Sequence, residues 1–292
     1  RTVVMIEASR NSSTNQGKIF LMSTCAPPCF PSRWVRSRAS TNVMGIMARV
    51  RVSLTMVAYS STAPLVPWRV SQVEAAAVTE DGALLASAFQ CSGLTHSRTL
   101  MPMVEGMLKN ADLSLAACDA IAVAVGPGSF TGIRIGVAAA KGLAFGAGIP
   151  VIGVSTLEAM ATGLAHWNGL VICAMDARRQ QVYNANFAAK VGTLTRLTED
   201  RAIALSELVK EVENDERPKI IVGDGGRLCY NALLEQGVPC VLAPPHLLQQ
   251  SAAAMGLAAE EALRRGETPV SAQELLPVYL RQAQADRLRN HN

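Results

Sequence analysis

The sequence predicts an α/β protein built from two similar halves, each with parallel strands joined by crossover helices. Three observations support this fold class. Short apolar runs alternate with stretches of helical periodicity, a glycine-rich loop separates one apolar run from the next helix, and the alternation starts again after residues 166–169. Strands and helices that alternate along a chain usually form a parallel sheet covered by its helices.

The first expected elements are a β-hairpin and an amphipathic helix. Val73–Thr79 and Ala83–Phe89 are apolar runs joined by Glu80-Asp81-Gly82, and Asp-Gly is typical of a tight hairpin turn. From Leu100 to Ala111, apolar residues recur at helical spacing, which predicts one buried stripe. Pro102 is expected in the first turn of that helix, where its missing N–H leaves no hydrogen bond unmade.

The next elements surround the glycine-rich loop. Ala120–Val125 is an uninterrupted apolar run, as expected of a strand buried on both faces. After the loop, the pattern predicts a helix, a strand and a second helix, which Ser155 caps with Glu158 three residues further on. The expected bounds of these three elements are Ile133–Gly146, Val151–Val154 and Ser155–His166.

The second half repeats this alternation. Its expected strands are Leu170–Met175, Gln181–Phe187, Leu194–Arg196 and Ile220–Val222, and its expected helices are Leu205–Glu213, Arg227–Leu234 and Leu247–Arg265. We therefore expect an N-terminal lobe over residues 71–168 and a C-terminal lobe over residues 169–292. The final helix and the tail are expected to return to the first lobe.

Charge divides the chain at residue 70. Residues 1–70 hold nine Lys and Arg against the single acid Glu7, and they show no sustained period. We expect this atypical basic segment to be disordered, an organellar transit peptide or a mistranslated gene start. The remaining residues hold 18 basic and 22 acidic side chains, which argues against a broad nucleic-acid surface.

Composition excludes several classes of protein. No run of about eighteen apolar residues is free of charges, so no membrane association is expected. The seven cysteines are scattered rather than paired, which fits the reducing cytoplasm. The four histidines form no His-x-x-x-His pair, so no metal site is expected.

The glycine-rich loop is the first candidate site. It lies between a strand and a helix, where free backbone N–H groups and the helix dipole favour an anion. It matches neither the Walker A motif nor Gly-x-Gly-x-x-Gly nor Gly-x-Ser-x-Gly, so an anion site and a tight packing turn both remain open. The candidate residues are Gly126, Gly128, Ser129, Thr131, Gly132 and Arg134.

Asp176 and Arg178 form the second candidate site. Asp176 follows a predicted buried strand, and α/β proteins place ligands at the carboxyl ends of such strands. A carboxylate and a guanidinium there can bind a ligand, or they can form an ordinary surface ion pair.

The segment Gly126-Pro-Gly-Ser-Phe-Thr-Gly-Ile-Arg-Ile-Gly-Val, continuing to Glu158, resembles the bacterial TsaB (YeaZ) family. Further matching segments are His96-Ser97, Asp176-Ala177-Arg178, Gly223-Asp224-Gly225 and Pro277–Arg281. The resemblance covers about residues 71–287.

The resemblance implies an actin-like (ASKHA) fold of two related lobes. It also implies a subunit of the machinery that makes N6-threonylcarbamoyladenosine at position 37 of ANN-decoding tRNAs. In that family, catalysis is attributed to the paralogous partner TsaD, with TsaB as the dimerising scaffold and the ATPase TsaE joining them. The tRNA would then be bound indirectly, through the complex. No cofactor is expected to bind tightly, and ATP or ADP is a candidate ligand at the subunit interface.

The residues themselves agree with a non-catalytic subunit. TsaD-like proteins carry a His-x-x-x-His metal pair, whereas here His96 is followed four residues later by Leu100. A glycoprotease-like peptidase and an ATP-binding enzyme on the same fold remain the alternatives. Candidates for the partner interface, which also fit ordinary core packing, are His96, Leu100, Val104, Met107, Gly136 and Ala140.

Two positions depart from the family pattern. The family opens with a strand that ends in Asp-Thr-Ser, whereas here Pro67 lies just before the hairpin and could not join a central strand. The sequence therefore predicts that the first strand is missing or that the N-terminal segment is mistranslated. Arg98 stands where the family usually has Glu.

Overall fold

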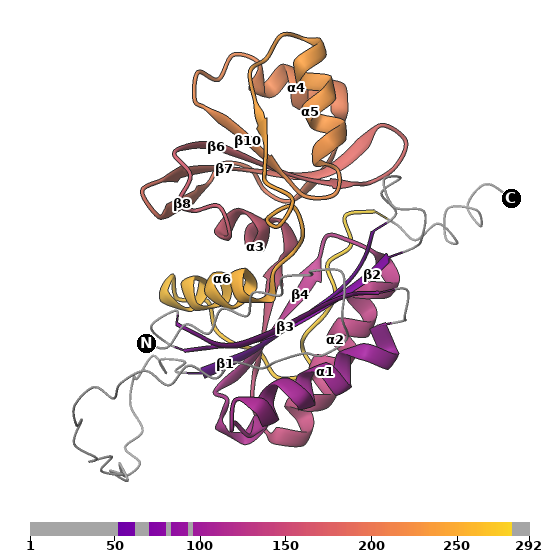
Figure 1. The fold of residues 1–292 in the computed structure, drawn as a ribbon, viewed down its shortest axis with the longest axis vertical. Coiled ribbons are helices and arrows are strands. Elements are labelled where there is room, and N and C mark those ends of the chain that lie inside the picture. Colours follow the sequence, from indigo (N-terminus) through magenta and orange to yellow (C-terminus); the bar gives the residue numbers. More distant parts are fainter. Residues whose placement is uncertain (1–51, 62–69, 80–82, 93–95, 282–292) are drawn as a thin grey trace, which may run out of the picture. The chain divides into compact units, whose positions relative to one another are not determined.

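The computed structural model describes residues 52–61, 70–79, 83–92 and 96–281 (Figure 1). The chain divides into two compact units, Arg1–Ile46 and Met47–Asn292, and all the described residues belong to the second unit. Among those residues, none of the helices is long and apolar enough to span a membrane.

The first sheet has five strands in the order β3-β2-β1-β4-β5. β1 pairs antiparallel with β2 and parallel with β4, β2 pairs antiparallel with β3, and β4 pairs parallel with β5. The strands are β1 (Val52–Ser61), β2 (Val70–Thr79), β3 (Leu84–Ser92), β4 (Ala120–Gly126) and β5 (Val151–Ser155).

The second sheet repeats this topology. Its order is β11-β10-β6-β7-β8, with β9 also paired to β7. β6 pairs antiparallel with β7 and parallel with β10, so β6 takes the place that β1 has in the first sheet. The strands are β6 (Gly169–Asp176), β7 (Gln181–Lys190), β8 (Thr193–Arg196), β9 (Arg201–Ala204), β10 (Lys219–Val222) and β11 (Val241–Leu242). This duplication gives the two related lobes that the sequence predicts.

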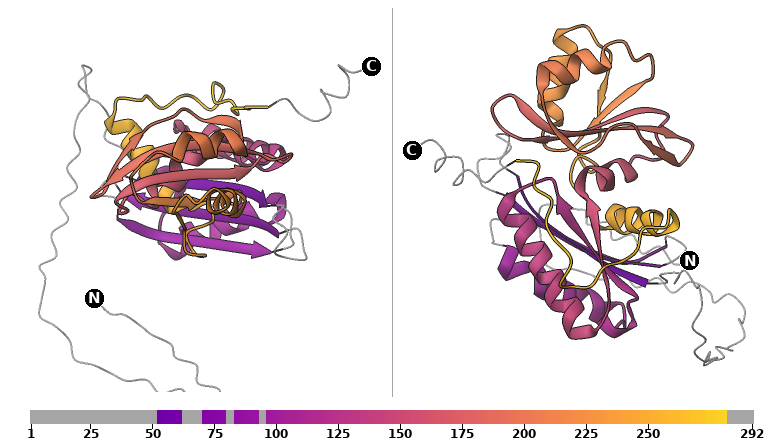
Figure 2. Two further views of the ribbon diagram at one scale, coloured as in Figure 1. Left: turned by 90° about the horizontal axis from the view of Figure 1, so that it is seen from above. Right: turned by 180° about the vertical axis from the view of Figure 1, so that it is seen from behind.

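Helices cover the faces of both sheets. α1 (His96–Asn110) and α2 (Phe130–Ala147) pack on one face of the first sheet, and α4 (Leu205–Val212) and α5 (Gly226–Glu235) pack on one face of the second (Figures 1 and 2). α3 (Thr156–Thr162) and α6 (Ala252–Arg264) pack against each other; α3 also contacts β6 of the second sheet, and α6 contacts strands of the first. A short 3-10 helix, Leu115–Ala117, precedes β4.

The side chains of the central strands explain the layers. Along β4, Ile121 and Val123 enter the core beneath α1 and α2, whereas the alternating alanines belong to the core shared with α3 and α6. Along β6, Leu170 and Ile172 face α4 and α5, whereas Val171 and Cys173 join the shared core. Alternate residues of a strand point to opposite faces, so both sheets are buried on two sides.

The structure overturns the prediction that the first strand is missing. β1 lies between β2 and β4, and its residues Thr55 and Met56 are fully buried. The strand lies upstream of Pro67 and contains no proline, so the proline argument addressed the wrong segment. The first lobe therefore begins at Val52 rather than at residue 71, and β2 has a neighbour on both edges. Val52-Ser53-Leu54-Thr55-Met56 alternates apolar and polar residues, but the apolar run Met56-Val57-Ala58 interrupts the alternation, so the strand pattern covers only half of β1.

Other differences concern where helices begin and end. α1 begins at His96, which places Pro102 in its second turn rather than its first. α6 begins at Ala252 rather than Leu247, because Ser251 caps it by accepting a hydrogen bond from Ala254 N. The predicted Ser155 cap of α3 is confirmed, with Glu158 N donating to Ser155 Oγ at 3.2 Å. The short strands β9 and β11 were not predicted.

Residues 265–281 form a tail that returns to the first sheet (Figure 2). Val270 forms a β-bridge with Val151, and Val278 N donates to Val125 O at 2.8 Å at the end of β4. The tail therefore runs past the glycine-rich loop.

Candidate functional site

The glycine-rich loop connects β4 to α2 and lies directly against the tail. Ser129 caps α2 by accepting a hydrogen bond from Gly132 N at 3.3 Å. Gly126 has φ +130°, and a Cβ placed there would lie 2.4 Å from the carbonyl oxygen of Val278. Only glycine fits at this position, because both its backbone conformation and the neighbouring tail exclude a side chain.

The loop also faces the second lobe. A Cβ on Gly128 would lie 3.4 Å from Met175 Cε, at the end of β6. Gly126 therefore lets the tail approach at Val278, and Gly128 lets the second lobe approach at Met175; both neighbours belong to this chain. Beside Gly126, the backbone carbonyl of Val278 occupies the space that a side chain would take. Thr131 is exposed beside the loop.

Asp176 and Arg178 shape the turn between β6 and β7. Asp176 Oδ1 accepts a hydrogen bond from the backbone N–H of Arg178 at 2.6 Å, and Asp176 N donates to Asp224 Oδ1. Arg178, Arg179 and Gln180 all have positive φ, between +55° and +62°. Three consecutive left-handed residues without glycine cost about 1–2 kcal/mol each, so Asp176 serves to hold a strained turn that presents two arginines.

The tail brings this turn close to the glycine-rich loop. Arg281 donates hydrogen bonds to Ala177 O and to Gln181 Oε1, at the base of the turn. Tyr279, two residues before Arg281 in the sequence, accepts a hydrogen bond from Arg134 near the start of α2. The two candidate sites predicted from the sequence are thus joined through the tail.

An aromatic cluster forms where the tail crosses α2. The ring centroids of Phe130 and Tyr279 lie 5.0 Å apart with planes inclined by 34°. The guanidinium carbon of Arg134 lies 3.9 Å from the Phe130 centroid, and Arg134 Nε donates to Tyr279 Oη at 2.9 Å. Phe130 and Tyr279 remain 37% and 41% exposed. We call Phe130, Arg134 and Tyr279 the aromatic cluster.

Sequence reasoning identified Arg134 but not Phe130 or Tyr279 as site residues. Arg134 and Tyr279 are 145 residues apart in the sequence. No local pattern reports such a contact, although the tail segment Pro277–Arg281 carries part of the family resemblance.

The residues predicted for the partner interface lie mostly in the core. Leu100, Val104 and Met107 are at most 5% exposed, Ala140 is fully buried, and Gly136 is also buried. Such side chains pack the lobe and cannot themselves touch a partner. His96 is the first residue of α1, and its side chain lies outside the described residues.

The opposite, outer face of α2 is exposed and nearly free of bulky polar groups. We define this outer face as Ala138, Gly142, Phe145 and Gly146; Phe145 is 73% exposed. A Cβ on Gly142 or Gly146 would meet nothing within 4 Å. Glycine within a helix costs about 0.5–1 kcal/mol relative to alanine, and no contact among the residues that the structure describes explains why these two are glycines.

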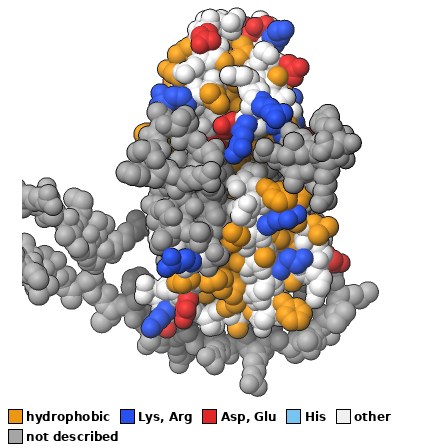
Figure 3. All heavy atoms as spheres, turned by 90° about the vertical axis from the view of Figure 1, so that its right-hand side faces the viewer, with side chains coloured by type: hydrophobic (Ala, Val, Ile, Leu, Met, Phe, Trp, Pro, Cys, Tyr) orange, Lys and Arg blue, Asp and Glu red, His pale blue; other side chains and the backbone are white. Residues whose placement is uncertain are grey.

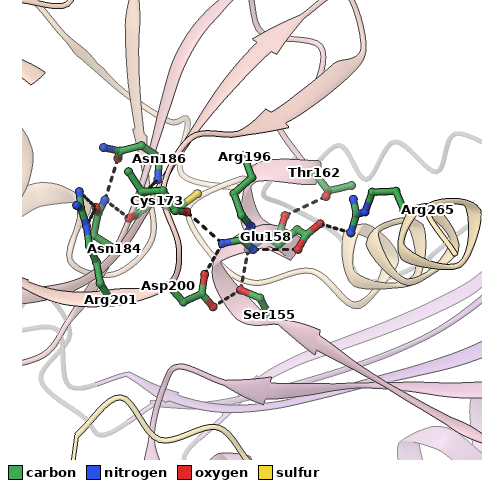
Figure 4. A network of polar contacts seen from close by, with 11 residues as sticks. Ser155, Glu158, Thr162, Cys173, Asn184, Asn186, Arg196, Asp200, Arg201 and Arg265 are labelled. Atoms are coloured by element: carbon green, nitrogen blue, oxygen red, sulfur yellow. Dashed lines mark hydrogen bonds and ion pairs between the residues drawn. The ribbon is translucent and has the colours of Figure 1, made fainter. Parts of the chain in front are cut away.

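A polar network connects the two lobes (Figure 4). Ser155 Oγ, at the end of β5, donates to Asp200 Oδ2 at 2.5 Å in the second lobe. Arg196 forms ion pairs with both Asp200 and Glu158, and Glu158 also pairs with Arg265 after α6. Burial alone would lower the pKa of Arg196, but the hydrogen bonds that it donates to Asp200 and Glu158 outweigh this effect and raise that pKa.

The thiol beside this network is poorly suited to act as a nucleophile. Cys173 is fully buried beside it, and burial followed by the nearby Asp200 charge raises the pKa of its thiol far above the usual range. A thiol in that state is a poor nucleophile. Ser129, the other nucleophile considered, has its hydroxyl engaged in capping α2. Within the described ranges, no group of three or more His, Cys, Asp or Glu could hold a metal ion.

A groove of about 560 Å³ runs between β3 and α1. It is lined mainly by small and apolar residues, among them Ala86, Ala88, Pro102, Met103 and Gly106. It holds no cluster of charged groups and offers no evident chemistry.

Comparisons with known proteins give a consistent result. The family model described as TsaD, tRNA N6-adenosine threonylcarbamoyltransferase, matches residues 91–287. The TsaB protein of Escherichia coli K12 is 36% identical over 208 residues, which cover 70% of this chain and 88% of the relative. The TsaB protein of Bacillus subtilis 168 is 33% identical over 192 residues, covering 65% of this chain and 82% of the relative. Both relatives are described as tRNA threonylcarbamoyladenosine biosynthesis proteins.

Solved structures agree. YeaZ from Pseudomonas aeruginosa superposes with a TM-score of 0.61 at 28% identity, covering 79% of this chain and all of that protein. Together with the duplicated sheet topology, this likeness confirms the two-lobed, actin-like α/β fold predicted from the sequence.

Proposed function

This chain belongs to the TsaB (YeaZ) family of tRNA threonylcarbamoyladenosine biosynthesis proteins, and we propose that it is the non-catalytic scaffold subunit of the complex that carries out this modification. In this proposal, the catalytic partner is a TsaD-type paralogue and a TsaE-type ATPase joins them. The tRNA is held mainly by the partners, and the complex acts in the cytoplasm.

The observation that carries this proposal is the outer face of α2. Gly142 and Gly146 open a flat strip on which a second helix could approach closely, and Phe145 beside them offers an apolar side chain. On the neighbouring α1, Met101 is 40% exposed. Small residues that allow close helix packing, next to an exposed aromatic ring, suit a protein partner better than a small substrate.

The non-catalytic role rests on residue identity. Leu100 stands where a TsaD-like protein has its second metal-binding histidine, and it is 1% exposed in the core of the first lobe. A buried leucine cannot bind a metal ion. A peptidase would need a free nucleophile, yet Ser129 caps α2.

Any ATP or ADP in the complex would be held at the interface with a partner. Val278 O lies against Gly126, and Arg134 beside the loop is engaged with Tyr279, so the chain leaves little room for a nucleotide next to Gly126. Groups from a partner subunit would have to complete such a site.

Reconstitution tests the proposal. The chain, purified with TsaD-type and TsaE-type subunits, is expected to form a stoichiometric complex that supports threonylcarbamoyladenosine formation on tRNA, measured by mass spectrometry of nucleosides. The chain alone should give no product. Gly142→Arg should abolish complex formation without unfolding the chain, because the position is open. Asn231→Arg on the exposed face of α5 is the matched control. Product made by the chain alone, or peptidase activity lost in Ser129→Ala, would overturn the proposal.

A further inference from the structure

The aromatic cluster has a feature that fold stability does not require. Two rings and a guanidinium plane lie together at the surface, and each ring keeps more than a third of its area exposed. The hydroxyl oxygen of Tyr279 accepts a hydrogen bond from Arg134 Nε, and this bond fixes the orientation of the ring. Exposed, oriented ring faces beside an arginine are typical of surfaces that stack unpaired bases.

A strip of cations adjoins the cluster along the tail. We call Arg134, Lys141, Arg178, Arg179 and Arg281 the basic strip. Lys141 Nζ donates to the carbonyls of Gln273 and Leu275, and Arg281 donates to Ala177 O and Gln181 Oε1. All of these acceptors are neutral, so the hydrogen bonds position the cations without cancelling their charges.

The local charge differs from that of the chain as a whole. None of the five cations forms an ion pair within the part of the chain that the structure describes. The described carboxylates of the tail and the β6–β7 turn are Asp176, Glu267 and Glu274; Glu267 pairs with Arg265, and Asp176 is engaged with the backbone of its own turn, beside Asp224. Figure 3 shows one face of the molecule, on which several Lys and Arg side chains adjoin hydrophobic ones and acidic side chains are also present. The strip is therefore a local positive surface on a lobe pair that is otherwise mildly acidic.

We propose that the aromatic cluster and the basic strip contact the single-stranded loop of the tRNA substrate directly. An unpaired base stacks on the exposed faces of Phe130 and Tyr279, and the arginines of the β6–β7 turn and of the tail meet the flanking phosphates. Unpaired loop bases expose the π-faces that such rings bind, and the phosphate chain supplies the matching negative charge. The inference rests on the proposed function, because it takes tRNA as the substrate of the complex.

Binding of tRNA to the reconstituted complex tests this inference. Phe130→Leu combined with Tyr279→Leu keeps apolar packing but removes the stacking faces, and it should weaken tRNA binding at least about fivefold in fluorescence anisotropy. Arg178→Gln combined with Arg179→Gln should reduce the slope of log affinity against log salt by about 1.4–2, since each lost phosphate contact accounts for about 0.7–1. Arg227→Gln, an exposed cation on α5 away from the tail, should leave both unchanged.

The outcomes separate this inference from the proposed function. If the wild-type chain forms no complex, or the complex binds no tRNA, the proposed function fails. If the leucine variant assembles normally and binds tRNA as the wild type does, only the inference fails. Loss of complex assembly in that variant would identify a protein contact and also overturn the inference.

A second measurement needs no variant. Photo-crosslinking of wild-type complex with tRNA carrying 4-thiouridine in its anticodon loop should yield adducts within residues 130–134 or 276–281. Adducts confined to other subunits or other segments would refute the direct contact.

Discussion

Replacing the two outer-face glycines of α2 with alanine should change stability and partner binding in opposite directions. A Cβ at Gly142 or Gly146 meets nothing within 4 Å, and neither residue has a positive φ, so alanine introduces no steric cost in the isolated chain. Each substitution should gain about 0.5–1 kcal/mol of helix stability. The double variant should therefore unfold about 2–8 °C higher than the wild type, since 1 kcal/mol corresponds to about 2–4 °C for a protein of this size.

Partner affinity should fall for the same structural reason. If a partner helix packs closely on this face, two added methyl groups overpack the contact, which typically costs about 1–3 kcal/mol. That loss corresponds to about a fivefold to hundredfold weaker complex.

The assay combines thermal unfolding of the isolated chain with calorimetric titration of the TsaD-type partner. Asn231→Ala on α5 is the control, because it improves helix propensity on an exposed helix of the other lobe and should leave affinity unchanged. A double variant that is more stable and binds the partner as tightly as the wild type would refute the assignment of this face to a partner.

Four further predictions concern stability and reactivity. Thr55→Val should raise the free energy of unfolding by about 1 kcal/mol in a denaturant titration, because the fully buried hydroxyl of Thr55 has no hydrogen-bond partner; a loss of stability would contradict this. Gly126→Ala should cost at least about 2 kcal/mol and make the tail sensitive to protease, because the new Cβ collides with Val278 O; an unchanged digestion pattern would argue against that contact. Cys240 should react with a thiol reagent before Cys229, since burial raises the pKa of Cys229 to about 12, and peptide mapping of the modified sites should show this order. The hydrogen bond from Arg217 lowers the pKa of Asp215. The pair therefore stabilises the folded chain above the ordinary carboxyl pKa, and this stabilisation is lost as pH falls through the lowered pKa. Arg217→Gln should lower the free energy of unfolding by at most about 1 kcal/mol at pH 7 and not at all near about pH 2.

Local sequence patterns predicted the regular elements well where one physical signal dominated. β4 is a continuous apolar run with Gly126 at its end, and Ser155 caps α3 by hydrogen bonding to the N–H of Glu158, as its position indicates. These features depend on residues that are close in the sequence. The side chain of Glu158 shows the limit of such reasoning, because it pairs with Arg196 and Arg265 rather than folding back to the cap.

The first strand and the site could not be found in the same way. The apolar–polar alternation of β1 ends at Met56, and its partners β2 and β4 are brought together only by the sheet. The aromatic cluster forms only because the tail crosses α2, and no periodic pattern in the sequence predicts that crossing. Most of the residues predicted for the partner interface lie in the core, because periodicity identifies the buried stripe of a helix; the exposed residues Gly142 and Phe145 of α2 lie on the other face.

The contacts between the lobes bear on what the fold can do. Enzymes that close two lobes around a ligand need those lobes to move relative to each other. Here Ser155 and Asp200 join the lobes through a 2.5 Å hydrogen bond, and the tail joins β4 at Val125 to the β6–β7 turn through Arg281. Closure or opening would break partly buried polar contacts, each of which is costly to leave unpaired. The proposed scaffold role, in contrast, gains from these links, because they hold the outer face of α2 and the aromatic cluster in a fixed relation for the protein and the RNA that we propose as partners.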